Sequence, residues 1–464
     1  MSHTNKNIVN SKDRVGVAQK LSYSIGFAGK DGFTTIVNSY LMLFLMTIGG
    51  LDPTFIGLMM LGARIWDAVN DPILGSIADH TNTKWGKFRP YMFSAIPMAI
   101  IFAALFFVPD LSNTGRMVYY TVVYVFYGMC FTVLEIPYFG LVSAMTKDPE
   151  ERASITAWSR IISRIPAIAL PLFLAYLTVQ LGEEKGYFIN AIIIGAIAVI
   201  AAFISFFGCK EKALIKSEPA AQKASSFQDF LNVIKGNRAL LIVMLVQLFF
   251  TFNTILADML NTYYVTYSLG SPGLITGLAV SLVAVGACIG QFAYPYVLRY
   301  VKSCKRLMMI GIPIYAALLA LCYISGNISI PMYLVFLVAS NLFTGALQIN
   351  VINLCFEVCD VLEYKNGVRA DATVFAVVSF LMKLAAGFAS TIAGWGLALV
   401  GFTGGLGPVQ GEVTQAMADG VAILRFALPG GLALISLLLV FLYPITKNQI
   451  EDVRIELLKR HNEE

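Results

Sequence analysis

The sequence has little charge. Only 13% of its 464 residues are Asp, Glu, Lys or Arg, whereas 57% are hydrophobic. A soluble protein carries about 25% charged residues, so this chain has too little polar surface to remain in solution. Long apolar runs recur along it, such as AIIIGAIAVIAAFISFF (191–207) and SLLLVFLYPI (436–445). The composition therefore predicts an all-α integral membrane protein of many spans.

Residue types that build many enzyme and metal sites are also scarce. The three histidines (His3, His80 and His461) lie outside the apolar runs, and no HExxH or nucleophile-elbow motif is present. The seven cysteines occur singly, without metal-ligand spacing, which argues against a disulfide framework. Residues 1–20 lack the features of a signal peptide and are interpreted as a polar cytoplasmic lead. We therefore expect no enzyme and no cofactor.

Twelve apolar segments are long enough to be membrane spans. The distribution of Lys and Arg predicts that both termini are cytoplasmic, because basic clusters follow the second span (Lys84, Lys87, Arg89) and the eighth. Only Arg116, Lys185 and Arg425 are assigned to outside loops. This asymmetry accounts for the net charge of +5 without a nucleic-acid partner. The expected spans are 21–48, 54–78, 90–109, 117–145, 155–181, 187–208, 239–268, 273–301, 307–325, 330–359, 373–401 and 420–446.

A polar stretch divides the spans into two sets of six. CFTVLE (130–135) is similar to CFEVCD (355–360), and DPTFIGL (52–58) to PGLITGL (272–278), at similar separations across this stretch. Two six-span halves with internal repeats are the plan of the major facilitator fold, whose site lies near mid-membrane. The expected organisation is a lead (1–20), a six-helix bundle (21–208), a central cytoplasmic loop (209–238), a second six-helix bundle (239–446) and a cytoplasmic tail (447–464).

WDAVNDPILG (66–75) places two carboxylates inside the second span. Asp67, Asn70 and Asp71 are spaced i, i+3 and i+4, so they share one helix face. A charge in mid-membrane costs about 2.5–3.5 kcal/mol, which favours a function for the pair. Their oxygens suit a small monovalent cation or a proton. The alternative is an ion pair with Arg64 or a salt bridge at the cytoplasmic end of the span.

Other ionisable residues also lie within apolar spans. They include Lys30 and Asp31 in GFAGKDGF (26–33), Glu135 in the fourth span and Arg160 in the fifth. Carboxylates and guanidinium groups form charge-assisted hydrogen bonds with the hydroxyls of a sugar. The same charges could instead pair with one another, and the two roles are compatible.

Several blocks of this sequence together resemble the glycoside–pentoside–hexuronide:cation symporters, which include melibiose permease. The blocks are GKD in the first span, WDAVNDPILG followed by KWGKFRPY, and EIPYFGLV (135–142). The resemblance covers essentially the whole chain. It implies the major facilitator fold with 12 transmembrane helices and transport by alternating access. It also implies a multi-pass monomer among the lipids of a bacterial-type cytoplasmic membrane.

The resemblance further implies residue roles. Asp67, Asn70, Asp71 and Thr132 match the family's cation site, which implies Na⁺ as the coupling ion, with H⁺ or Li⁺ as alternatives. Lys30, Asp31, Glu135, Phe139, Arg160 and Lys383 match its sugar site, and Arg152, Asp360, Glu363 and Arg369 match its cytoplasmic charge network. Melibiose permease has aspartate, tryptophan and tyrosine where Glu135, Phe139 and Phe131 stand here. The resemblance therefore indicates the ion more closely than the sugar.

Two other functions remain open for a chain of this fold. A transporter of a lysolipid or another amphiphile would need a wide apolar cleft and a lone cation, not the acids Asp31 and Glu135. A non-transporting sensor derived from a carrier would have no need of intact cation residues. The expected partners are thus a small sugar or glycoside and a monovalent cation.

Overall fold

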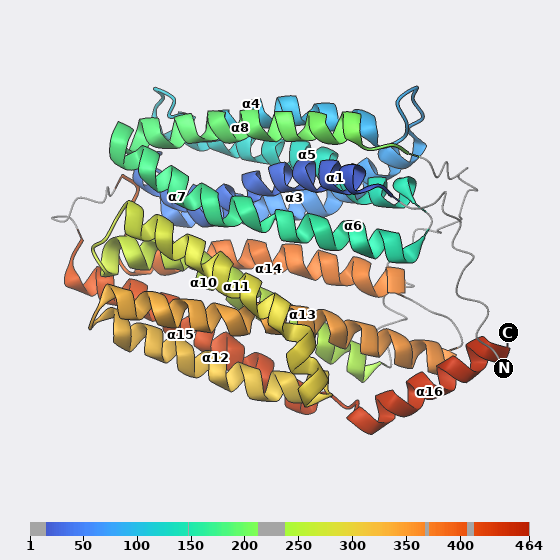
Figure 1. Cartoon of the computed structure of the whole chain (residues 1–464). Helices are drawn as coiled ribbons and strands as arrows, with labels where there is room; N and C mark the ends of the chain where they lie inside the picture. Colours follow the sequence, from blue (N-terminus) through green and yellow to red (C-terminus); the bar gives the residue numbers. More distant parts are fainter. Residues whose placement is uncertain (1–14, 147, 212–236, 367–370, 406–412, 464) are drawn as a thin grey trace. The chain divides into compact units, whose positions relative to one another are not determined.

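The computed structural model describes residues 15–146, 148–211, 237–366, 371–405 and 413–463. Every named element in these ranges is helical, as the composition predicts (Figure 1). Each of the twelve expected spans overlaps one helical element or a run of two or three consecutive ones. By length and hydropathy alone, nine helices of the described part of the chain qualify as membrane spans, and Arg89–Leu105 is a shorter apolar helix.

The described residues form two compact units. One comprises Met1–Leu51 and Trp66–Glu218, and the other Asp52–Ile65 and Pro219–Glu464. The first part of α3 therefore belongs to the second unit. The chain up to residue 211 contains α1 (Val17–Ile36), η1 (Val37–Leu41), α2 (Met42–Thr47), α3 (Pro53–His80), η2 (Arg89–Ser94), α4 (Ala95–Leu105), α5 (Asn113–Met145), α6 (Pro149–Ile162), α7 (Arg164–Leu181) and α8 (Glu183–Gly208).

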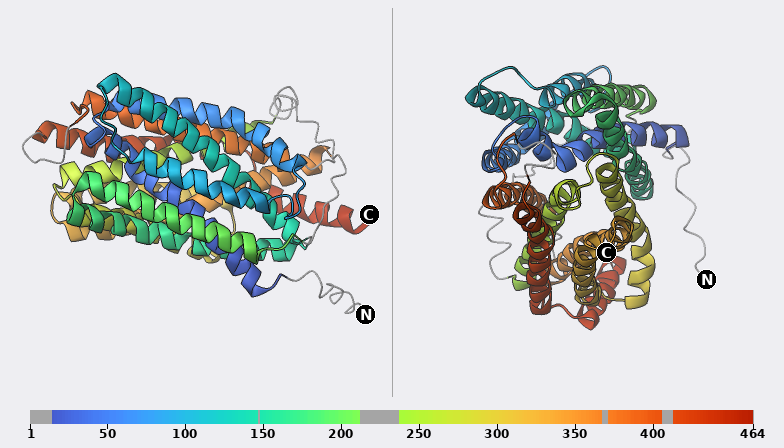
Figure 2. Two further views of the ribbon diagram at one scale, coloured as in Figure 1. Left: turned by 90° about the horizontal axis from the view of Figure 1, so that it is seen from above. Right: turned by 90° about the vertical axis from the view of Figure 1, so that its left-hand side faces the viewer.

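The helices after residue 237 all belong to the second unit. In it α13 packs against both α11 and α12, and α10 packs against α14 and α15 (Figure 2). The tail expected at 447–464 contains a helix, α16. The elements are α10 (Arg238–Tyr263), η3 (Tyr264–Ser268), α11 (Leu274–Val301), α12 (Cys304–Gly326), α13 (Ile330–Asn366), α14 (Asp371–Leu399), α15 (Gln415–Leu442) and α16 (Lys447–Glu463).

The assignment of Arg425 to an outside loop, made from the distribution of charges, is wrong. Arg425 lies within α15 and is only 2% exposed. Its one charge sits near the start of a long apolar run, where sequence alone does not separate the end of a span from its interior. The described chain therefore contains a buried cation that the sequence analysis misplaced.

Close contact between α1 and its neighbours positions the GFAGKDGF segment. A Cβ atom at Gly26 would overlap the hydroxyls of Ser205 in α8 and Tyr138 in α5. One at Gly29 would lie 2.7 Å from the Cβ of Ala201 in α8. The glycines thus bring the backbone of α1 against α8, with Lys30 and Asp31 held at a packed helix interface.

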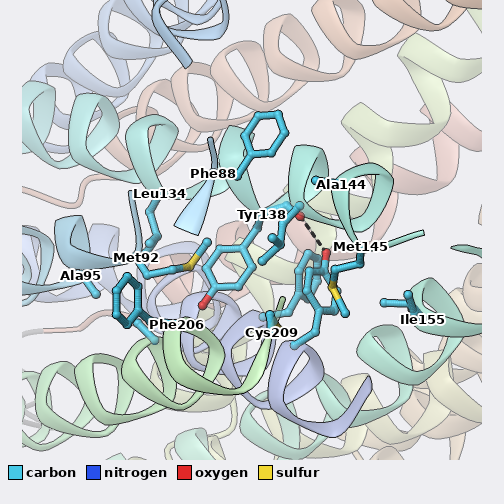
Figure 3. Packing of buried hydrophobic residues seen from close by; sticks show 14 of the residues in the cluster. Phe88, Met92, Ala95, Leu134, Tyr138, Ala144, Met145, Ile155, Phe206 and Cys209 are labelled. Atoms are coloured by element: carbon cyan, nitrogen blue, oxygen red, sulfur yellow. Dashed lines mark hydrogen bonds between the residues drawn. The ribbon is translucent and has the colours of Figure 1, made fainter. Parts of the chain in front are cut away.

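A cluster of buried side chains holds α5 in the first unit. Tyr138 of α5 packs with Phe206 and Cys209 at the end of α8 and with Met92 of η2 (Figure 3). The Tyr23 hydroxyl of α1 donates to the Tyr138 carbonyl oxygen at 3.0 Å. This cluster lies one turn along α5 from Glu135, so it restrains the part of the helix that carries the candidate site.

The Glu211 carboxylate fastens the chain after α8 to the turn that precedes η2. It accepts hydrogen bonds from the backbone N–H groups of Lys87 (2.7 Å), Phe88 (2.9 Å) and Arg89 (2.9 Å). Gly86 has φ +114°, and a Cβ there would lie 2.5 Å from the carboxyl carbon of Glu211. The turn therefore both requires glycine and encloses this carboxylate.

We predict that Glu211→Ala destabilises the protein by about 2–3 kcal/mol, because three backbone donors lose a charged acceptor. Thermal unfolding of the purified full-length protein measures the loss. The matched control is Glu451→Ala, which removes an exposed pair with Lys447 at 3.4 Å and costs about 0–1 kcal/mol. Equal losses in the two variants would contradict the role assigned to Glu211.

Candidate functional site

The buried ammonium group of Lys30 joins α1 to α5. Its Nζ lies 2.7 Å from Asp31 Oδ1 and 2.9 Å from Glu135 Oε1. Lys30 is 3% exposed, whereas the side chains of Asp31 and Glu135 are 22% and 31% exposed. The structure thus brings together three residues expected at the sugar site, as an ion-pair triad with accessible carboxylates.

Aromatic rings enclose the triad. Lys30 Nζ lies 4.6 Å from the centre of the Phe27 ring and 5.0 Å from that of Phe131, within the range of cation–π attraction. The Arg160 guanidinium lies 5.5 Å from the same Phe27 ring. The triad alone has a formal charge of −1, and Arg160 brings the group to zero. The two carboxylates therefore compensate the buried Lys30 ammonium group, while Asp31 and Glu135 remain partly exposed and Arg160 is exposed.

The residues expected to bind the cation lie on α3 and α5. Asp67, Asn70 and Thr132 are 6%, 7% and 5% exposed. The Thr132 hydroxyl donates to Asp71 Oδ1 at 3.1 Å, which links the two helices. A Cβ at Gly128, one turn before Thr132, would lie 2.5 Å from Asp67 Oδ1. The structure therefore brings Asp67, Asp71 and Thr132 to the contact between α3 and α5, and Asn70 is buried on the same helix as the two acids.

The four residues expected to bind the cation carry two carboxylates, an amide and a hydroxyl. Within the described residues, no three or more His, Cys, Asp and Glu side chains come together in a way that could hold a metal ion. Hard, partly neutral oxygen donors are the type that s-block cations use.

The two groups of residues meet on α5. Thr132 contacts Asp71, and Glu135 contacts Lys30. Residues three apart on a helix lie on the same face, one turn along. A displacement of this turn of α5 changes both contacts at once. The sequence analysis identified the members of each group but not this arrangement.

A cavity of about 210 Å³ lies beside the triad in the first unit. Phe139, Arg160 and Arg152 are among the residues that line it. Arg152 had been assigned to a cytoplasmic charge network, and its Nε donates to the Thr146 carbonyl oxygen at 2.9 Å. The remaining lining residues were not predicted and are Tyr23, Phe27, Val142, Ser143, Thr156 and Ser159.

The other predicted residues lie in the second unit or outside the described chain. Lys383 is a half-buried residue of α14, and Asp360 and Glu363 lie in α13. Arg369 falls outside the described residues. The roles expected of these four residues, like those of the other predicted site residues, remain predictions.

Comparisons with known proteins place the chain among sugar transporters. Residues 22–447 match the family described as MFS/sugar transport protein. The chain is 27% identical over 450 residues to the uncharacterized symporter YjmB of Bacillus subtilis, covering 95% of each. It is 27% identical over 399 residues to the isoprimeverose transporter of Lactiplantibacillus pentosus, covering 84% of this chain and 82% of that one.

A solved structure agrees on the fold. A bacterial homologue of the human lysosomal transporter Spinster, inward-facing and unoccupied, superimposes with a TM-score of 0.68. The two share 14% sequence identity over 94% of this chain and 97% of the other. These matches confirm the expected fold and an assignment to transporters, not enzymes. The chain belongs to the MFS/sugar transport protein family, within its glycoside–pentoside–hexuronide:cation symporter group.

Proposed function

We propose that this protein is a cation-coupled symporter that carries a glycoside, pentoside or hexuronide across the cytoplasmic membrane by alternating access. The observation that carries the proposal is the pairing on α5. Thr132 contacts Asp71 of α3, and Glu135, one turn later, contacts Lys30 of α1. One helical turn therefore contributes to both the proposed cation site and the proposed sugar site.

The cation is Na⁺, held by Asp67, Asn70, Asp71 and Thr132. A proton needs only one basic atom, whereas a metal cation needs several oxygen donors around it. The amide oxygen of Asn70 and the hydroxyl of Thr132 cannot take up a proton at physiological pH, but both can coordinate Na⁺. The composition of the group therefore favours Na⁺ over H⁺, with Li⁺ as a second metal of the same kind.

The sugar binds at Asp31, Glu135, Arg160 and the rings beside them. Ionised carboxylates accept hydrogen bonds from hydroxyls, and such charge-assisted bonds are strong. The exposed face of Phe139 gives the apolar side of a sugar ring a surface to pack against. Lys30 and Lys383 complete the proposed set. A lysolipid carrier has no evident use for the two partly exposed acids.

We attribute the coupling of the two ligands to side-chain contacts that Na⁺ binding replaces. When Na⁺ binds Asp71, it takes the oxygen that accepts the Thr132 hydrogen bond, and Thr132 turns its own oxygen to the ion. The resulting shift of α5 moves Glu135 relative to Lys30 and frees the carboxylate for sugar hydroxyls. Each ligand then changes the other's affinity by the same factor, as linkage requires.

Transport by the full-length protein in sealed proteoliposomes tests this function. A panel of galactosides, xylosides and glucuronides is supplied under an inward Na⁺ gradient. We expect at least one sugar to accumulate above its outside concentration, and the uptake to collapse when an ionophore abolishes the gradient. Uptake driven equally well by a proton gradient without Na⁺ would contradict the choice of ion, and accumulation of none of the sugars would contradict the substrate class.

Asp71→Asn is expected to abolish Na⁺-driven accumulation while sugar exchange persists, because the amide retains the volume of the carboxylate but not its charge. The matched control is Asp52→Asn at the start of α3, where Asp52 accepts from the Thr54 N–H at 2.9 Å. Asparagine supports the same capping bond, so this variant keeps full transport. Uphill uptake at the wild-type rate in Asp71→Asn would exclude Asp71 from the cation site.

Glu135→Gln is expected to weaken sugar binding at least about tenfold, equivalent to about 1.4 kcal/mol. The amide is a poorer acceptor for sugar hydroxyls, and Lys30 keeps only Asp31 as a counter-charge. Glu135→Asp retains the charge and is expected to lose less affinity than Glu135→Gln. Binding of radiolabelled sugar and of Na⁺ is measured separately, and Na⁺ affinity should stay within about threefold. Equal sugar affinity in both variants and the wild type would remove Glu135 from the sugar site.

A further inference from the structure

Arg425 is the largest fully buried side chain in the described part of the chain. It lies in α15, in the second unit, among residues that the proposed transport site does not use. Its Nη2 is 3.4 Å from Asn261 Oδ1 of α10, and its guanidinium carbon is 5.1 Å from the centre of the Phe426 ring. Neither contact supplies a negative charge, although a buried guanidinium is costly without one.

Two nitrogen atoms of Arg425 have no acceptor. Nε and Nη1 are buried and make no hydrogen bond within the described chain. Asn261 Oδ1, the acceptor nearest to Nη2, already receives the Tyr333 hydroxyl at 2.6 Å. Leaving a buried donor without an acceptor costs about 1–3 kcal/mol, and more when the donor is charged. We therefore expect a further hydrogen-bond acceptor beside the Arg425 guanidinium.

A small cavity adjoins the guanidinium. Its volume is about 10 Å³, and Asp258 of α10 lines it together with Arg425. The two side chains form no direct ion pair within 4.0 Å. The described lining comes from α10, α12, α13 and α15 and consists of Thr254, Ala257, Asp258, Tyr315, Leu319, Ser340, Asn341, Thr344 and Arg425.

The hydroxyl groups of this lining donate their protons elsewhere. Thr254, Ser340 and Thr344 donate to backbone carbonyl oxygens of their own helices at 2.9–3.1 Å. Tyr315 donates to Asn253 Oδ1 at 3.3 Å. These oxygens can therefore only accept within the cavity, as the Asp258 carboxylate does. The Arg425 nitrogens supply donors on the opposite side.

We propose that one water molecule occupies this cavity and bridges the Arg425 guanidinium to the Asp258 carboxylate. The ligand has to accept from Arg425 and donate to Asp258 and the hydroxyl oxygens. Water does both, whereas chloride accepts only and would face a carboxylate and several lone pairs. The volume also matches one water, which needs about 10–15 Å³ and two to four polar partners. The bridge links the buried cation to the counter-charge of the Asp258 carboxylate and ties α10 to α15.

The test combines a density map with a set of variants. Full-length protein in lipid nanodiscs is imaged at a resolution that shows ordered water. Thermal unfolding is measured for the wild type, Asp258→Asn, Arg425→Gln and the double variant, each in sodium chloride and in sodium gluconate. The double variant carries neither the Asp258 nor the Arg425 charge, so no buried charge is left without a partner. It can therefore be measured even where a single variant folds poorly.

We expect density for one water within hydrogen-bond distance of Arg425 and Asp258. Asp258→Asn, which strands the cation, should lower Tm by at least about 4 °C, and the double variant should recover at least half of that loss. Chloride should leave the wild-type Tm unchanged. A direct contact between Arg425 and Asp258, a double variant no more stable than Asp258→Asn, or stabilisation by chloride that Arg425→Gln abolishes would each overturn the proposal.

Discussion

The Lys30 ammonium group, buried between two carboxylates, is the interaction on which the rest of the site depends. A lone ammonium or carboxylate at this depth in a membrane protein would be too costly. Together, Lys30, Asp31 and Glu135 are paired, while the acids remain partly exposed and able to bind another ligand. Glycines in α1 allow this arrangement, because side chains at Gly26 or Gly29 would push α1 away from α5 and α8.

Much of the fold could be predicted because a membrane limits the possibilities to apolar helices. Runs of apolar residues located the apolar helices but not the polar α16, and a shared face placed Asp67, Asn70 and Asp71 together. Partners on other helices could not be derived in this way. Lys30 and Glu135 are 105 residues apart, and spacing along one helix says nothing about such a pair. Only the family resemblance brought Thr132 to the acids of α3.

Arg425 shows the limit of the same reasoning. A hydropathy pattern assigns a single arginine near the start of an apolar run to a loop, because the pattern carries no information about the residues that contact the arginine. Arg425 is buried beside Asn261 of α10, more than a hundred residues earlier in the chain, and beside a cavity lined from α10, α12, α13 and α15. The position of Arg425 can thus be explained only from the packing of the helices, whereas the shared face of Asp67 and Asp71 could be predicted from their spacing.

We propose that α5 couples the binding of Na⁺ to the binding of the sugar, and calorimetric titration of the purified protein measures this coupling. Sugar affinity is measured with and without saturating Na⁺, and Na⁺ affinity with and without the sugar identified by transport. The account predicts that each ligand raises the other's affinity by the same factor, and that Thr132→Val reduces this factor toward one. Sugar affinity that does not depend on Na⁺ in the wild type would contradict it.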